Sequence, residues 1–148
     1  MKNWLDELLR QLFTGHHLEI TANGNFSATL KMQIPEHRDI IFTFLKEVAP
    51  DITGFVIKDH TFEFIVVEFK DTKIRLDDIY QTRKYAELFD ARYALLVSTE
   101  EMPVEIIRLS SVVPYLLPIP GYGKLTLVQL SKDGKSSTWF PTSPFPNS

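Results

Sequence analysis

Two acidic side chains and a lysine occupy positions from which they could act on a metal-bound phosphate. Asp51 follows Pro50 directly before a predicted strand, and the next predicted strand closes with Glu68, Phe69 and Lys70. Side chains alternate faces along a strand, so Glu68 and Lys70 point the same way and Phe69 points opposite. Hard cations such as Mg²⁺ bind one or two protein carboxylates together with phosphate and water. A lysine beside that water can orient it or stabilise the developing hydroxide.

Two strands, at about 52–58 and 61–69, must bring these groups together. The short turn at 58–60 predicts that the strands pair as a hairpin. That pairing sets Asp51 opposite Glu68. The later strand is apolar at nearly consecutive positions, which is typical of a central strand covered on both faces.

The remaining pattern predicts an α/β protein in which helices flank a central mixed β-sheet. A hairpin is expected to be added near the N-terminus and further strands near the C-terminus. We expect helices at about 2–13, 35–49, 75–90 and 103–111 and strands at about 93–97, 125–130 and 138–140. A hairpin is expected around Asn23-Gly24-Asn25, in which 18–21 pairs with 26–30 or with a longer strand that reaches 34. One domain is expected over 1–140, followed by an extended or disordered proline-rich tail over 141–148.

The helix after the lysine carries further polar side chains. Gln81 and Tyr85 are four positions apart, which places them on one helical face. Lys73, Arg83 and Lys84 surround the same stretch and could contact the phosphates of a nucleic acid. The alternatives are a solvated helix face for the basic residues and Gln81, and an ordinary core ring for Tyr85.

Residues 36–98 resemble the PD-(D/E)XK nuclease superfamily, which includes restriction endonuclease-like, Holliday-junction resolvase-like and RecB-like nucleases. The motif reads Asp51 after a proline, and then Glu68, Phe69 and Lys70. RecB-like members also carry Gln-x-x-x-Tyr on the following helix, which Gln81 and Tyr85 match. The resemblance implies a restriction endonuclease-like core.

The resemblance also implies roles for these residues in a nuclease that hydrolyses DNA. Asp51, Glu68 and the backbone carbonyl of Phe69 would bind Mg²⁺, with Mn²⁺ as a substitute, and Lys70 would attend the nucleophilic water. Gln81 would be a further catalytic residue. The residues expected to bind the substrate are Tyr85, Lys73, Arg83 and Lys84.

The family often has one more acid on the helix before the aspartate. Glu47 is the nearest candidate in sequence, and Glu36 and Asp39 lie on the same predicted helix. If the family helix is instead 2–13, then Glu7 or its neighbour Asp6 takes that place. The choice stays open, and so do the substrate structure and the endo or exo mode.

Composition limits the classes of function. The chain has no cysteine, which excludes disulfides, cysteine-bound zinc and thiol nucleophiles and fits a cytoplasmic protein. No apolar run approaches the roughly 20 residues of a membrane span, and no leader pattern opens the sequence. The net charge of −3 counts mildly against a general nucleic-acid binder.

Two rival hypotheses follow from that charge and from the short chain. One is a non-catalytic binding or assembly module that retains the fold. The other is a subunit of a defence or repair complex whose partner supplies specificity. A homodimer would suit an enzyme that cuts both strands of a duplex.

Overall fold

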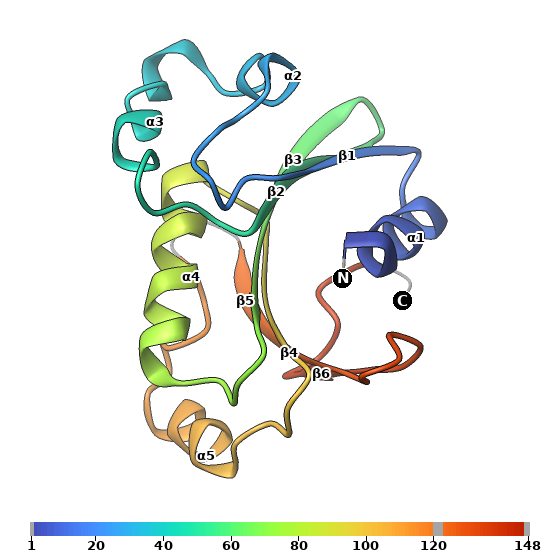
Figure 1. Cartoon of the computed structure of the whole chain (residues 1–148), viewed down its shortest axis with the longest axis vertical. Helices are drawn as coiled ribbons and strands as arrows, with labels where there is room; N and C mark the ends of the chain where they lie inside the picture. Colours follow the sequence, from blue (N-terminus) through green and yellow to red (C-terminus); the bar gives the residue numbers. More distant parts are fainter. Residues whose placement is uncertain (1, 120–122, 147–148) are drawn as a thin grey trace.

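A six-stranded mixed sheet forms the centre of the protein, with helices on both of its faces (Figure 1). The computed structural model describes residues 2–119 and 123–146. The helices are α1 Lys2–Leu12, α2 Ala28–Lys31, the 3-10 helix η1 Glu36–Arg38, α3 Ile41–Phe44, α4 Leu76–Phe89 and α5 Val104–Val112. The strands are β1 Gly15–Ile20, β2 Ile52–Lys58, β3 Thr61–Lys70, β4 Tyr93–Ser98, β5 Lys124–Leu130 and β6 Ser137–Phe140.

The strands lie in the sheet in chain order, from β1 to β6. The first three pair antiparallel, β3, β4 and β5 pair parallel, and β6 returns antiparallel to β5. The helices α4 and α5 connect the parallel strands, as parallel pairing requires. The prediction of a mixed sheet flanked by helices is therefore confirmed.

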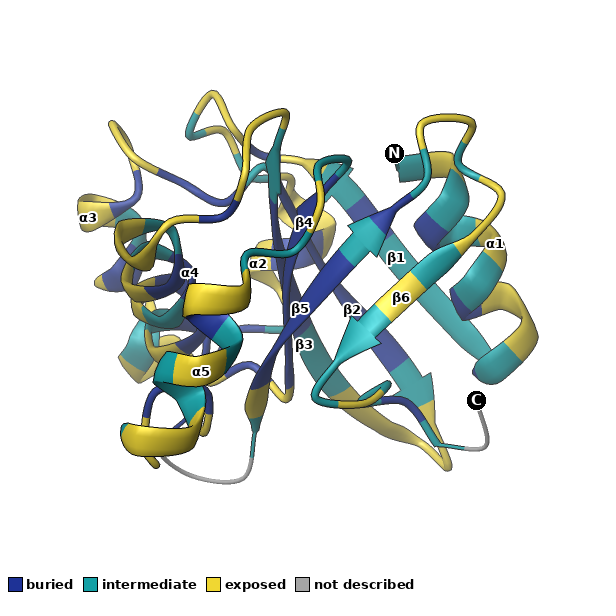
Figure 2. Cartoon of the chain, turned by 90° about the horizontal axis from the view of Figure 1, so that it is seen from below, coloured by how far each residue is buried: buried dark blue, intermediate teal, exposed yellow. Residues whose placement is uncertain are grey.

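The central strands are covered on both faces. In β3, Ile65 and Val67 pack in a cluster with Leu5 and Leu9 of α1, while Val66 packs on the opposite face with residues of α4. Figure 2 shows β4 and β5 buried in the middle of the molecule. This two-sided burial confirms the interpretation of the apolar run in β3.

The predicted N-terminal hairpin is wrong, although its turn forms. Gly24 adopts a positive φ of 81° and its N–H donates to Thr21 O at 2.9 Å. The chain then enters α2, because the Ser27 hydroxyl accepts from the Leu30 N–H at 3.1 Å and caps that helix. The expected second strand, 26–30 with its extension to 34, is therefore not formed, and β1 pairs with β2 instead.

The single helix expected over 35–49 is also wrong. The structure has only the short η1 and α3 in this segment. Arg38 donates to the carbonyl oxygens of Glu87 and Leu88, at 3.1 and 2.6 Å, and so ties the segment to the end of α4. Ile40 is 59% exposed. The segment does not form the continuous helix whose apolar side was expected to bury this residue.

The other predicted helices and strands are confirmed to within a few residues. In the tail, Phe145 is buried, and its ring lies 4.9 Å from that of Tyr93 and 6.0 Å from that of Phe13. Its last two residues, 147–148, lie outside the described chain. Across the described residues, no helix is long and apolar enough to cross a membrane.

Candidate functional site

The register of the β2–β3 hairpin places the two acids side by side, as predicted. Ile52 pairs with Val67, so the next position back, Asp51, lies opposite Glu68. The Asp51 N–H donates to Glu68 Oε1 at 2.9 Å, and the Phe69 N–H donates to Asp51 Oδ2 at 2.7 Å. The two carboxylates are thus held at one end of the sheet by the backbone of the opposite strand.

A buried threonine fixes the segment that carries Asp51. The Thr21 N–H donates to Asp51 O at 3.0 Å, and the Thr21 hydroxyl donates to Pro50 O at 2.6 Å. The same hydroxyl lies 2.8 Å from that of Thr53. No pattern in the sequence marks Thr21 as part of the site, because its partners are distant along the chain.

Lys70 lies between two acidic side chains. Its Nζ is 3.9 Å from Glu68 Oε2 and 3.6 Å from Asp78 Oδ1. Asp78 was missed by the sequence analysis. It stands in the first turn of α4, where its other oxygen accepts from the Arg75 N–H at 2.9 Å. The bond to the Arg75 N–H fixes Asp78 at the start of α4, but its contact with Lys70 depends on how α4 packs against the end of β3, which no local pattern in the sequence predicts.

Glu68 is only 4% exposed, and its environment disfavours the charged form. Burial and the neighbouring Asp51 raise the pKa of Glu68 from 4.5 to about 7, against the opposing effects of the Asp51 N–H and Lys70. The protonated form of Glu68 is therefore far more populated near neutral pH than that of an ordinary glutamate. A cation at the pair would favour its charged form.

Gln81 and Tyr85 meet on one face of α4, as their spacing predicts. Gln81 Nε2 donates to the Tyr85 hydroxyl at 3.1 Å. Burial, with the charges of Glu68 and Asp51, raises the pKa of Tyr85, so the phenol stays neutral. Its side chain is fully buried. Tyr85 is thus placed to hold Gln81 and not to touch a substrate.

The expected basic residues differ in exposure. Lys73 and Lys84 are exposed, and Lys84 Nζ lies 5.4 Å from the centre of the Tyr85 ring. Arg83 is half-buried, and its Nε has no hydrogen-bond partner within the described chain. These positions leave Lys73 and Lys84 accessible to a polyanion.

The oxygens of the pair suit a hard cation. Glu68 Oε1 and Asp51 Oδ2 accept the backbone N–H groups, so the oxygens left to face an ion are Asp51 Oδ1 and Glu68 Oε2, the second of which lies 3.9 Å from Lys70 Nζ. Mg²⁺ usually binds only one or two protein carboxylates and keeps several water ligands, so two carboxylate oxygens are enough for such a site. Over 2–119 and 123–146, no group of three or more His, Asp or Glu side chains could hold a metal ion.

Among the described residues, none of the upstream acids shares a hydrogen-bond or ion-pair partner with Asp51 or Glu68. Asp6 pairs with Lys2 at 2.8 Å and His16 at 2.9 Å, and Glu7 pairs with Arg10 at 2.6 Å. The other three, Glu36, Asp39 and Glu47, are exposed.

Comparisons with protein-family models, curated proteins and solved structures give no match to this chain. The assignment of a function therefore rests on the chemistry and geometry of the hairpin end. The central feature is the pair Asp51 and Glu68, with Lys70 on the same face of β3 as Glu68.

Proposed function

We propose that this protein is a metal-dependent nuclease with a restriction endonuclease-like core that hydrolyses DNA phosphodiester bonds. The observation that carries the proposal is the meeting of Asp51, Glu68 and Lys70 at the end of the β2–β3 hairpin. The order β2, β3, α4, β4 agrees with the strand–strand–helix–strand order of the PD-(D/E)XK core. Gln81 and Tyr85, which are hydrogen-bonded to each other on α4, match the Gln-x-x-x-Tyr motif of RecB-like members and give further support.

Each residue of the site would have a separate role. Asp51 and Glu68 would hold Mg²⁺ or Mn²⁺ through the oxygens that accept no backbone N–H, together with the carbonyl of Phe69. The ion supplies charge neutralisation at the phosphate and a lowered pKa of a bound water. Lys70 would orient a water for in-line attack on phosphorus, and Gln81 would help to position it. As the new P–O bond forms, the P–O3′ bond would break and the 3′ oxygen would take a proton, which gives a 5′-phosphate and a 3′-hydroxyl.

Removal of the metal tests this proposal directly. Cleavage of a labelled oligonucleotide in Mg²⁺ should stop in EDTA and return on addition of excess Mg²⁺ or Mn²⁺, because the reaction needs the charge of the ion. Gel electrophoresis of the products measures both rates. An undiminished rate in EDTA would contradict the proposal.

Asp78 offers a sharper test of the role of Lys70. Asp78→Asn should lower the cleavage rate about 10- to 100-fold, as is usual when a group that orients a metal-site residue is lost. The asparagine keeps an oxygen for the Arg75 N–H, so the start of α4 should stay intact. Asp77→Asn is the matched control, because Asp77 is adjacent and its side chain is 87% exposed. Equal rates for the two variants would show that Asp78 does not support Lys70.

A second candidate is a non-catalytic module, alone or as a subunit of a larger complex. The hydrogen bonds that Asp51 and Glu68 exchange with the backbone join the start of β2 to the end of β3 without any metal. This structural role would account for both acids. Calorimetry separates the candidates, since a non-catalytic module should bind no Mg²⁺ or Mn²⁺.

A further inference from the structure

A cleft of about 590 Å³ opens beside Asp51 on the face of the sheet that carries α1. Its volume falls in the range of small-molecule sites. The start of α1, the end of β1 and the ends of the β2–β3 hairpin form its walls. The lining residues are Lys2, Asn3, Ile20, Ala22, Asp51, Ile52 and Phe69.

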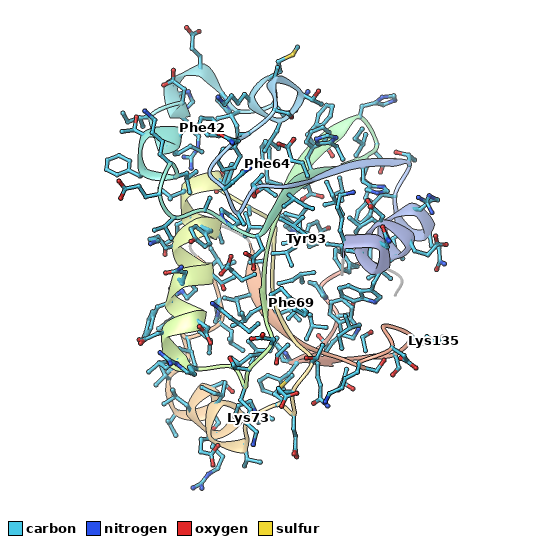
Figure 3. All side chains as sticks on the ribbon, viewed as in Figure 1. Phe42, Phe64, Phe69, Lys73, Tyr93 and Lys135 are labelled. Atoms are coloured by element: carbon cyan, nitrogen blue, oxygen red, sulfur yellow. The ribbon has the colours of Figure 1, made fainter. Side chains whose placement is uncertain are left out.

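Asp51 belongs both to this cleft and to the proposed metal site. Lys70 faces α4, where it meets Asp78, while Phe69 packs on the opposite face with the cluster that includes Leu5 of α1. Figure 3 shows Phe69 on the side of the sheet away from α4. Asp51 therefore links the cleft to the carboxylate pair, whose other member, Glu68, lies 3.9 Å from Lys70 Nζ.

The lining has the chemistry of a nucleobase site. Ile20 is 67% exposed at the cleft and gives it an apolar wall, and Phe69 adds a half-buried aromatic ring. Asn3 is exposed and carries both donors and an acceptor for the edge of a base. The Lys2 ammonium lies 2.8 Å from Asp6, which offsets its charge, so the cleft favours a flat, neutral heterocycle over a bare anion.

We propose that the cleft binds an unpaired nucleotide next to the cleaved phosphodiester, so that the substrate is single-stranded DNA or an unpaired DNA end. This inference rests on the proposed nuclease function. A base inside a duplex is stacked and paired, and it must leave the stack at an energetic cost before it can enter such a cleft. An unpaired base enters without that cost and gains contact with the Phe69 ring and the Ile20 wall.

Binding to a cleavage-deficient protein tests the inference apart from catalysis. In a Lys70→Ala background with Mg²⁺, fluorescence anisotropy would compare a labelled oligothymidylate with a blunt duplex of equal length. The single strand should bind at least about tenfold more tightly than the duplex, the difference that one stacked base can supply. Equal affinities would overturn the inference.

Two variant pairs locate the effect in the cleft. Phe69→Leu and Ile20→Ser should each weaken single-strand binding about five- to tenfold and leave duplex binding unchanged. The matched controls, Phe62→Leu near the far end of β3 and Ile40→Ser outside the cleft, should change neither. Because Ile20 is exposed, Ile20→Ser keeps the test valid even if Phe69→Leu disturbs the core. Effects equal to those of the controls would overturn the inference.

The two proposals fail in different ways. If the wild type cuts duplex and single strand equally and the cleft variants match their controls, the nuclease function stands and the cleft inference falls. If the single strand binds with cleft dependence but the wild type never cuts it, the catalytic proposal is wrong, and only the binding of an unpaired nucleotide in the cleft is supported. An absence of any DNA binding overturns both.

Discussion

Asp51→Asn should lower the rate of DNA cleavage at least about a thousandfold. The bound ion supplies several kcal/mol of charge stabilisation, and each 1.36 kcal/mol corresponds to a factor of about ten in rate. Asparagine removes the negative charge that holds the ion. It keeps an oxygen that can accept the Phe69 N–H, so the hairpin end should retain its structure.

The measurement is the initial rate of cleavage of a labelled oligonucleotide in Mg²⁺ at neutral pH. Asp77→Asn makes the same chemical change at an exposed position on α4 and should keep the wild-type rate. Unfolding curves of both variants would establish that each is folded. A folded Asp51→Asn protein with a near wild-type rate would contradict the assignment of Asp51 to the metal.

Glu68→Gln should make the metal-free protein more stable at about pH 8 while abolishing cleavage. The native pKa of Glu68 is about 7 and its ordinary value is 4.5, so the native state holds this proton more tightly than the unfolded state. The stabilisation is complete below pH 4.5 and is lost as the pH rises through 7. One pH unit corresponds to ~1.4 kcal/mol, so the charged carboxylate costs the native state about 3 kcal/mol at pH 8. Glutamine avoids that cost and can still accept the Asp51 N–H.

Thermal unfolding in EDTA measures this effect at about pH 5 and about pH 8. At the higher pH, Glu68→Gln should melt about 6–12 °C above the wild type, with a smaller difference at the lower pH. Added Mg²⁺ should stabilise the wild type and leave Glu68→Gln unchanged, because a ligand of the native state stabilises it by mass action. If Glu68→Gln were less stable than the wild type at pH 8, the charged Glu68 carboxylate would stabilise the native state. That result would contradict a raised pKa for Glu68.

The sequence predicts the hairpin end because its determinants are local. The strand patterns of β2 and β3 and the short turn between them set the register, and the register sets Asp51 against Glu68. The four-residue spacing of Gln81 and Tyr85 is likewise a property of one helix. These parts of the site need no knowledge of distant contacts.

The parts that the sequence analysis missed depend on distant or competing contacts. The Asn-Gly turn after β1 forms, but the Ser27 cap turns the following segment into α2 and β1 finds its partner in β2. Thr21 supports Asp51 from a segment far away in the chain. The cleft is assembled from α1, β1, β2 and β3, so no single stretch of sequence contains it.

The most direct test of the metal site is Mn²⁺ binding by isothermal titration calorimetry to the wild type, Asp51→Asn and Asp77→Asn. The wild type and Asp77→Asn should bind the ion alike, more tightly above pH 7 where Glu68 is charged, and Asp51→Asn should not bind it. This result would place the ion on the paired carboxylates. An absence of binding to the wild type, or equal binding to Asp51→Asn, would contradict the metal site and favour the non-catalytic module.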